Sequence, residues 1–226
     1  DLAILNVHNF YIKRALKLKN FSPKIIKINK KTNINFINKV KNKYFETDGN
    51  KENLQFIFAV MKILKLKKNL LFKILEKFKG LSYRQEIIYN SKKLTIINDS
   101  KATSLSSSKS LLGSLNNVYW IVGGLAKKGD ALSLNSKKHR NIRAYIFGKD
   151  KEFFIYKLKK LMRYESFLNL KTLIQKIFLD IKEDKELPHK TILFSPAAAS
   201  FDSFKNFEER GKYFNKLINK HINAKQ

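Results

Sequence analysis

Short apolar runs alternate with helical repeats along most of this chain. Runs of β-branched and apolar residues between polar breaks predict strands, and apolar positions three or four residues apart predict amphipathic helices. Before Gly80, the pattern predicts strands at 1–7 and 24–30, an irregular polar stretch up to Asp48, and helices beginning at Asn53 and Asn69. Glycine after the last periodic position is a common helix stop, because it adopts left-handed backbone at no steric cost.

Beyond Gly80 the pattern predicts a sheet. Two apolar segments, 84–90 and 93–99, flank a polar turn and predict a β-hairpin. The remainder predicts helices at 103–115, 151–162, 166–182 and 206–222 and strands at 118–124, 142–148 and 191–195. Strands interleaved with helices are typical of α/β proteins. We therefore expect a mostly parallel sheet covered on both faces, with ligands outside the carboxyl ends of its strands.

Composition narrows the classes of protein. The length of 226 residues suits one large domain or two small ones. The residues are 43% hydrophobic, which is enough for a packed core. No apolar run is long enough to span a membrane and the first residues do not resemble a secretory signal, so we expect a cytoplasmic protein with no membrane partner. Cysteine is absent, and the histidines show no ligand spacing, so we expect no disulfide and no metal site within the chain. The histidines are His8, His139, His189 and His221.

The charge is strongly basic. Lys and Arg number 47 against 18 Asp and Glu, a formal net charge of +29, and such an excess is the usual footprint of nucleic-acid binding. However, 41 of the basic residues are Lys and 6 are Arg, spread along every segment of a chain that is also rich in Asn, Ile and Phe. The codons of these residues are rich in A and T, so a genome of low GC content would produce this composition for any function. Nucleic-acid binding is an alternative that rests on charge alone, and we expect no nucleic-acid partner.

The polar residues 98–103, NDSKAT, join a predicted strand to a predicted helix. Asp99, Ser100 and Thr103 are ordinary helix-capping residues, so one interpretation is a capped helix start. The other is that Lys101 and Thr103 offer a charge and a hydroxyl beside free helix amides, an arrangement that binds phosphate or carboxylate. The residue types alone leave both interpretations open.

Two further polar segments follow predicted strands. Residues 122–130, VGGLAKKGD, contain a glycine pair and Lys127, so they form either a plain turn or a close approach to an anionic ligand. They lack the Lys-Ser or Lys-Thr of a P-loop. Residues 193–214 place three alanines and Ser200 after a strand, and their phenylalanines, Phe207 among them, line either a pocket or the core.

Taken in order, these segments resemble the C-terminal half of the Mur ligases, which act in peptidoglycan precursor synthesis. The matching residues are FKGLSYRQE (78–86), INDSKAT (97–103), WIVGGLAKKGD (120–130) and LFSPAAASFDSFKNFEERGKYF (193–214). Within the family, NDSKAT is similar to the sequence of the ligases that add D-glutamate. The resemblance covers nearly the whole chain and is strongest from Phe78 onward.

The resemblance implies two domains and a set of site residues. Residues 1–79 would be the last part of an α/β central ATPase domain, and residues 80–226 a Rossmann-like C-terminal domain with a mostly parallel sheet. Four residues match family positions around the adenosine of ATP, namely Asn50, Asn53, Arg84 and Asp99. Five match positions that hold the D-glutamate carboxylates or shape their pocket, namely Lys101, Thr103, Lys127, Ser200 and Phe207. Lysines and hydroxyls suit a dicarboxylate, because charge-assisted hydrogen bonds are the strong ones.

The chain departs from the family pattern at three positions. Gly49 stands where the family usually has His before the first Asn of its N-x-x-N motif, which leaves the register of Asn50 and Asn53 open. Tyr83 replaces a family His, and Ala198 replaces a family Cys. The last two changes leave the implied pocket intact.

The resemblance also implies an activity. The family uses ATP and Mg²⁺ to activate the carboxylate of UDP-N-acetylmuramoyl-L-alanine as an acyl phosphate, which the amine of D-glutamate then attacks. The P-loop, the Mg²⁺ ligands and a carbamylated lysine required for this step are not matched here, and no GK[ST] occurs in the chain. The chain also begins at Asp1 rather than Met. We therefore expect a fragment without its N-terminal part, with no catalytic residue of its own and inactive alone. We also expect a monomer. A sibling ligase with a different amino-acid substrate is a further alternative.

Overall fold

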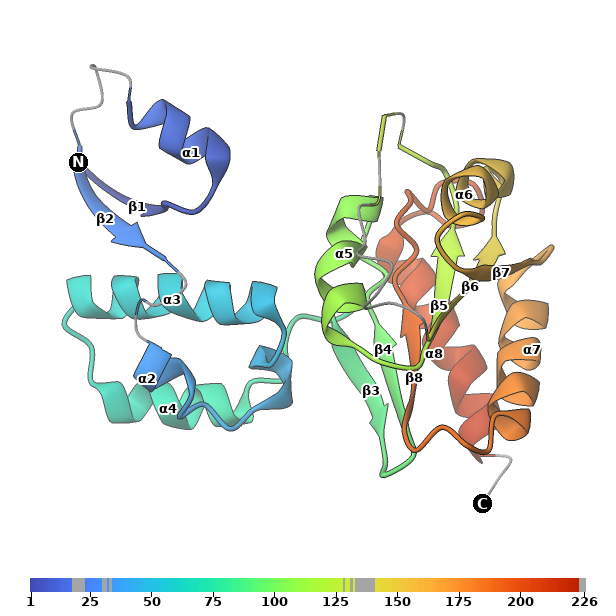
Figure 1. Ribbon diagram of the computed structural model, residues 1–226. Coiled ribbons are helices and arrows are strands. Elements are labelled where there is room, and N and C mark those ends of the chain that lie inside the picture. Colours follow the sequence, from blue (N-terminus) through green and yellow to red (C-terminus); the bar gives the residue numbers. More distant parts are fainter. Residues whose placement is uncertain are drawn as a thin grey trace. The chain divides into compact units, whose positions relative to one another are not determined.

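The computed structural model describes residues 1–17, 23–29, 32, 34–127, 129–130, 132 and 141–223. The chain divides into two units, Asp1–Lys79 and Gly80–Gln226 (Figure 1). Lys30, Lys128 and His139, which belong to segments or sites considered above, lie outside the described residues. The correspondence of the two units to two domains of the family stays a prediction.

The first unit combines a pair of strands with a small helical core. Its elements are β1 (Leu2–Asn6), α1 (Phe10–Ala15), β2 (Lys24–Ile28), α2 (Ile34–Ile37), the 3₁₀ helix η1 (Lys43–Phe45), α3 (Asp48–Ile63) and α4 (Lys68–Lys77). β1 and β2 pair in parallel. Buried side chains of α2, η1, α3 and α4 form one cluster, which includes Phe45, Phe58 and Leu75.

This unit is more regular than the sequence pattern predicts. The stretch before Asp48, expected to be irregular, contains α2 and η1. α3 begins at Asp48 rather than Asn53, because the Thr47 hydroxyl caps it by accepting the N–H of Asn50 at 3.3 Å. The first turn of α3 is polar, so an apolar repeat does not reveal it. Gly80 has the expected left-handed backbone, with φ of 83°, although α4 has already ended.

The second unit is built around a sheet of six described strands (Figure 1). Its elements are β3 (Glu86–Asn90), β4 (Leu94–Asn98), α5 (Leu105–Ser114), β5 (Val118–Gly123), β6 (Ile142–Phe147), α6 (Lys151–Leu158), β7 (Arg163–Ser166), α7 (Leu170–Glu183), β8 (Lys190–Phe194) and α8 (Phe207–Asn223). The strand order is β3-β4-β8-β5-β6-β7. β3 and β4 pair antiparallel, and the other described neighbours pair in parallel. The predicted hairpin and the mostly parallel sheet are confirmed.

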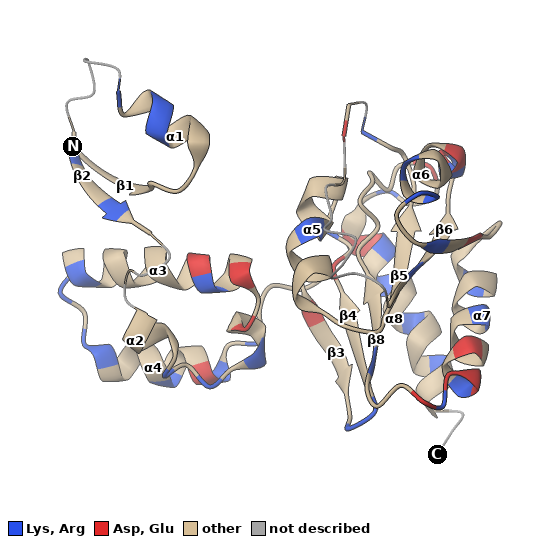
Figure 2. Ribbon diagram, viewed as in Figure 1, with Lys and Arg blue, Asp and Glu red and all other residues tan. Residues whose placement is uncertain are grey.

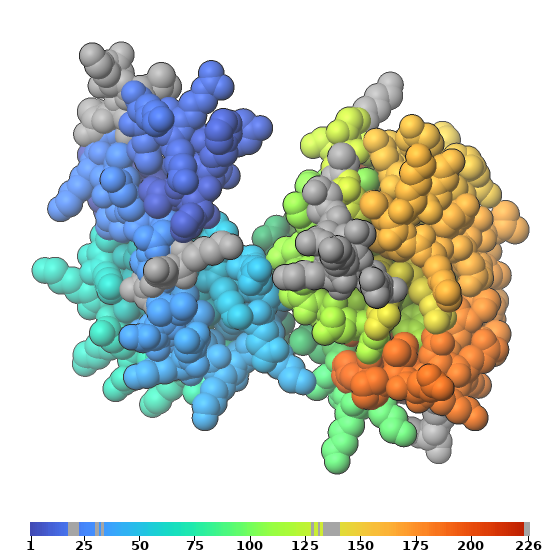
Figure 3. Space-filling model, viewed as in Figure 1, coloured from blue at the N-terminus to red at the C-terminus, as the bar shows by residue number. Residues whose placement is uncertain are grey.

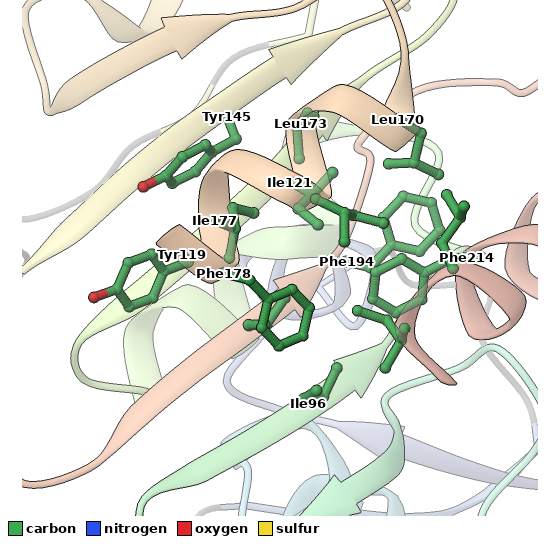
Figure 4. Close-up of a cluster of buried hydrophobic side chains, with 14 of the residues drawn as sticks. Ile96, Tyr119, Ile121, Tyr145, Leu170, Leu173, Ile177, Phe178, Phe194 and Phe214 are labelled. Carbon is green, nitrogen blue, oxygen red and sulfur yellow. The ribbon is translucent and has the colours of Figure 1, made fainter. Parts of the chain in front are cut away.

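Helices cover both faces of this sheet. α7 and α8 pack on one face, where the buried residues include Ile121, Phe194 and Phe214 (Figure 4). α5 and α6 pack on the other, where Trp120 and Phe154 are fully buried. β5 and β8 are therefore buried along their whole length, as expected for strands with helices on both sides. No helix in the described part of the chain is long and apolar enough to cross a membrane.

The outer edge of the sheet differs from the sequence-based prediction. The pattern predicts a helix at 166–182 and no strand before it, but Arg163–Ser166 forms β7 and α7 begins only at Leu170. All residues of β7 are exposed, so no buried alternation marks them as a strand. The start of α7 is set by the side chain of Asn169, which accepts the N–H of Thr172 at 3.0 Å.

Candidate functional site

Three loops meet at the carboxyl ends of β4, β5 and β8. Leu125 and Ala199 exchange backbone hydrogen bonds of 3.0 and 2.9 Å, which join the loop after β5 to the loop after β8. The carboxylate of Asp130 accepts the N–H of Leu105, which ties the loop after β5 to the start of α5. The three polar segments that the sequence indicates thus lie together, because the carboxyl ends of parallel strands share one edge of a sheet.

Asp99 lies in a buried hydrogen-bond chain at this edge. It is 4% exposed. Its Oδ1 accepts the N–H of Gln85 at 3.1 Å, and its Oδ2 accepts the hydroxyl of Ser195 at 2.8 Å. The Ser195 hydroxyl in turn lies 2.7 Å from the hydroxyl of Ser108. Burial raises the pKa of Asp99 to about 6, opposed by these two hydrogen bonds and by the charge of Arg84. Each carboxylate oxygen keeps a lone pair that can accept a further hydrogen bond.

The segment before β3 is held in a strained conformation. Tyr83 and Gln85 have left-handed backbone, with φ of 62° and 50°, which costs free energy for residues that carry a Cβ. The carbonyl of Tyr83 accepts the N–H of Lys101 at 3.0 Å, and the Tyr83 ring packs against Gly211 of α8. These contacts offset the strain and hold the exposed Arg84 beside the loop after β4.

The Gly211→Ala substitution tests this packing. Glycine in a helix is ordinarily about 1 kcal/mol less favourable than alanine, but here an added Cβ would lie 2.3 Å from Cδ1 of Tyr83. We therefore expect Gly211→Ala to destabilise the second unit, and to stabilise it in a Tyr83→Gly background that removes the ring and tolerates the positive φ. Urea unfolding followed by the fluorescence of buried Trp120 measures both effects. The same effect in both backgrounds would show that the ring does not restrict this position.

Lys101 and Phe207, two of the predicted D-glutamate residues, are in contact. Nζ of Lys101 lies 4.1 Å from the centre of the Phe207 ring, which is a cation–π distance. Lys101 is exposed on the loop after β4, whereas Phe207 is half-buried at the start of α8. The ring thus holds the ammonium group where it can attract a carboxylate.

Thr103 does not cap α5. The capping residue is Ser104, whose hydroxyl accepts the N–H of Ser107 at 3.3 Å, while the Ser107 hydroxyl accepts the N–H of Ser104 at 3.2 Å. The capping interpretation is therefore wrong for Thr103. Its side chain is exposed and forms no hydrogen bond with other described residues, so its hydroxyl can reach a ligand.

The last two D-glutamate candidates lie on the joined loops. Lys127 is exposed on the loop after β5. The neighbouring Gly124 has a φ of 132°, and a Cβ there would lie 2.6 Å from the carbonyl oxygen of Ala199, so this close approach requires glycine. Ser200, next to Ala199, is buried. The structure thus places all five D-glutamate candidates on loops after these strands or at the start of α8.

Arg210 on α8 is a residue of this site that the sequence analysis missed. It is 1% exposed. It donates to the carbonyl oxygens of Ser100 at 2.7 Å and Ala198 at 3.0 Å, and to the Ser100 hydroxyl at 3.1 Å, so it links the loops after β4 and β8. Its Nη1 has no hydrogen-bond partner among the described residues. Burial lowers the pKa of Arg210 to about 10, opposed by the charge of Asp202.

The sequence does contain a signal for Arg210. It is one of 6 arginines in a chain with 41 lysines, and it precedes a glycine within a predicted helix. Five donors in a planar fork allow arginine to bond several carbonyl groups at once, which lysine cannot do with the same geometry. A rare arginine in a lysine-rich chain is therefore worth considering as a buried structural residue.

The remaining two ATP candidates, Asn50 and Asn53, lie in the first unit. Asn50 is 3% exposed, and its Nδ2 donates to the carbonyl of Tyr44 at 2.6 Å, which ties α3 to η1. Asn53 is exposed, and its Nδ2 donates to Oδ1 of Asn50 at 3.4 Å. Asn50 and Asn53 thus lie together in one unit, and Arg84 and Asp99 lie together in the other.

Arg84 and Asp99 are charged groups of the kind that an ATP site uses, and Mg²⁺ is usually held by only one or two carboxylates and the phosphates of its nucleotide. Arg84 supplies a positive charge near the carboxylate of Asp99, which is almost fully buried. No group of three His, Asp or Glu side chains within the described ranges could hold a metal ion.

Solved structures show which fold this is. The ligase MurC from Thermotoga maritima matches with a TM-score of 0.51 at 16% identity, over 77% of this chain and 39% of that one. MurF from Acinetobacter baumannii matches with a TM-score of 0.51 at 13% identity, over 76% and 38%. The likeness at these identities concerns the fold alone, which is that of part of a Mur ligase.

Curated relatives are more similar in sequence. The UDP-N-acetylmuramoylalanine–D-glutamate ligase of Wolbachia sp. subsp. Brugia malayi is 37% identical over 172 residues, 76% of this chain and 34% of the relative. That of Rickettsia bellii is 32% identical over 180 residues, 80% and 40%. No protein-family model matches the chain. The chain belongs to the Mur ligase family, and it spans between a third and two fifths of the length of these relatives.

Proposed function

We propose that this chain forms the D-glutamate side and part of the ATP side of a UDP-N-acetylmuramoyl-L-alanine:D-glutamate ligase. In the proposed reaction the γ-phosphoryl group of ATP passes to the muramoyl-alanine carboxylate with release of ADP. The amine of D-glutamate then attacks the acyl phosphate, and phosphate leaves. The partners are UDP-N-acetylmuramoyl-L-alanine, D-glutamate, ATP and Mg²⁺, and the protein acts as a monomer in the cytoplasm. The names of both curated relatives support this assignment.

The two units have different parts in this proposal. Asp1–Lys79 is the last part of the central ATP-binding domain, in which Asn50 and Asn53 approach the adenosine. Gly80–Gln226 is the C-terminal domain, in which Arg84 and Asp99 complete the ATP side. The division of the chain into these two units is consistent with the assignment.

Two exposed lysines without an ion pair, on loops that meet at one edge of the sheet, are the observation that most supports a dicarboxylate ligand. Neither Lys101 nor Lys127 forms an ion pair with a carboxylate among the described residues. The Thr103 hydroxyl adds a donor. Two cations and a hydroxyl suit the two carboxylates of glutamate, because each can receive a charge-assisted hydrogen bond.

Calorimetric titration of the 226-residue chain with D-glutamate tests the proposal. We expect saturable binding that is weaker for L-glutamate. Lys127→Gln should weaken it about tenfold or more, since a hydrogen bond to a charged group contributes about 1.5 to 3 kcal/mol. Lys92→Gln, on the β3-β4 turn, removes the same charge elsewhere and is the matched control. Equal affinity for both enantiomers, or equal loss in both variants, would contradict a D-glutamate site.

Titrations with other ligands separate two alternatives. Tighter binding of another amino acid would indicate a sibling ligase, since the choice of substrate depends on few contacts. Nucleic-acid binding would appear as affinity for an oligonucleotide that falls steeply between 50 and 200 mM salt. Only the charge of the chain favours the nucleic-acid alternative.

We expect the chain alone not to catalyse the reaction. It contains no GK[ST] to hold the γ-phosphate, and positioning with electrostatic stabilisation supplies most of the catalysis of phosphoryl transfer. Incubation with ATP, Mg²⁺ and both substrates should release no more ADP than incubation without D-glutamate. Release of ADP that requires both substrates would show this expectation to be wrong.

A further inference from the structure

A hollow lies at the edge of the sheet opposite the β3-β4 hairpin, away from the loops after β4, β5 and β8. Residues 143–145 of β6 and 159–165, from the end of α6 into β7, line about 690 Å³, and we name this hollow the edge pocket. β7 is the outermost described strand and is fully exposed. Figure 3 shows residues of this region, in gold to orange, on the surface of the second unit. A ligand can therefore reach the edge pocket from solvent.

Two arginines lie side by side in the edge pocket. Arg143 on β6 and Arg163 on β7 are register partners, and partners on neighbouring parallel strands project to the same face. Only 6 of the 47 basic residues are arginine, so a lysine-rich composition does not by itself account for this pair. Like charges directly opposite each other destabilise a sheet unless they are neutralised.

The protein neutralises only Arg143 of this pair among the described residues. Arg143 forms a two-pronged ion pair with Asp184, with N–O distances of 2.9 and 3.0 Å. Arg163 forms no ion pair with a described carboxylate. Glu165 is the one carboxylate in the lining, and it already lies 4.0 Å from the ammonium of Lys176. The positive charge of Arg163 is thus left for a ligand.

Two lysines add to this excess. Lys159 and Lys160 directly follow α6, where a helix C-terminus favours cations, so alone they indicate nothing further. With Arg163 they give the edge pocket three cations without an ion pair among the described residues, beside the paired Arg143 and one carboxylate, Glu165. The adjoining hollow of about 590 Å³ shares both arginines but also contains three acidic residues from the end of α7 and the segment after it. Figure 2 shows the basic residues in blue between α6 and β7.

We propose that the edge pocket binds the phosphate group of a small phosphorylated molecule, a site separate from the proposed ligase site. Guanidinium groups present parallel N–H donors that match phosphate oxygens, and Arg163, which has no ion pair among the described residues, can bind the phosphate together with the ammonium groups of Lys159 and Lys160. Leu161 and Met162 give the lining an apolar part. The volume falls within the range of small-molecule sites and exceeds that of phosphate alone, which leaves space for the rest of the ligand.

Titration of the 226-residue chain with pyrophosphate tests this site. We expect saturable binding that Arg163→Gln weakens about tenfold or more, the effect of losing one strong charge-assisted contact. Lys92→Gln removes one charge at the other edge of the sheet and should change the affinity less than about twofold, since it acts only through long-range, screened interactions. Because the Arg163 side chain is exposed and unpaired among the described residues, Arg163→Gln should leave urea unfolding, followed by Trp120 fluorescence, unchanged.

Three results would overturn the proposal. Equal weakening by Arg163→Gln and Lys92→Gln would mean that pyrophosphate responds only to the overall charge. Loss of binding in Lys127→Gln but not in Arg163→Gln would locate the phosphate in the loops of the candidate ligase site. Binding of a single-stranded oligonucleotide that depends on Arg163, with no binding of pyrophosphate, would identify a nucleic-acid surface instead.

Discussion

Asp99→Asn is expected to stabilise the second unit at neutral pH by about 3 kcal/mol. The pKa of Asp99 in the folded protein, about 6, lies above its ordinary value of 3.8, so the folded state binds a proton more readily than the unfolded state does. Its protonation therefore favours folding below about pH 4, and this contribution is lost as the pH rises through about 6. A difference of about two pKa units corresponds to about 3 kcal/mol. Asparagine avoids this loss because it does not ionise.

Asparagine also preserves the hydrogen bonds of Asp99. Its Oδ1 can accept the N–H of Gln85, and its Nδ2 can donate to the hydroxyl of Ser195. The Ser195 hydroxyl can then donate to Ser108, which reverses the direction of that bond without moving a heavy atom. The variant thus removes a buried charge and keeps a hydrogen-bond partner for both terminal atoms of the side chain, with one of the two Nδ2 hydrogens left over.

Urea unfolding at pH 5 and pH 8 measures this effect. Trp120 is the single tryptophan and is fully buried in the second unit, so its fluorescence reports on that unit. The difference in the free energy of unfolding between Asp99→Asn and the unsubstituted chain should grow by about 1 kcal/mol from pH 5 to pH 8. Glu208→Gln, which removes an exposed carboxylate at the start of α8, is the control. A difference for Asp99→Asn that stays constant with pH would contradict the raised pKa.

Arg210→Met is expected to disorder the loops after β4 and β8. The variant keeps a long stem but leaves the carbonyl oxygens of Ser100 and Ala198 without their buried donors, at about 1 to 3 kcal/mol each. Removal of a buried cation whose pKa is depressed to about 10 offsets part of this cost. We expect a net loss of about 2 kcal/mol in the stability of the second unit.

Hydrogen exchange distinguishes this role from general destabilisation. In Arg210→Met, amide exchange in residues 98–101 and 197–200 should accelerate more than in the β5 core, because the lost bonds join only these loops. D-glutamate binding should weaken in parallel if the proposed site is correct. Lys212→Met removes an exposed charge from the same helix and is the matched control. Identical exchange in Arg210→Met and Lys212→Met would rule out a role of Arg210 in ordering the loops.

Burial explains which strands the sequence could predict. β5 and β8 were predicted at 118–124 and 191–195, because a strand covered on both faces must be apolar at nearly every position. β7 was not predicted, because Arg163–Ser166 is exposed and is defined as a strand only by its pairing with β6. The first turn of α3 was not predicted for a similar reason, because it begins with a polar capping residue and not with an apolar repeat.

The candidate site likewise contains residues that the sequence could indicate and contacts that it could not. Lys101, Thr103 and Lys127 could be named from the sequence because short motifs place their charges and hydroxyls directly after strands. The rarity of arginine marks Arg210, but the sequence could not show what it binds, since its partner Ser100 is 110 residues away in the chain. Nor could local spacing show that the capping role belongs to Ser104 and leaves Thr103 exposed.

By itself, the sequence determined the order of most helices and strands, the excess of lysine and the motifs of the Mur ligase family, since these depend on residue types and near neighbours. Only the tertiary structure decided the burial that raises the pKa of Asp99 and the hydrogen bonds by which Arg210 links the loops after β4 and β8. It also decided the position of Arg143 opposite Arg163 on neighbouring strands. Each of these depends on segments far apart in the chain that meet in the folded sheet, where burial and hydrogen-bond geometry are set by contacts that no local pattern contains.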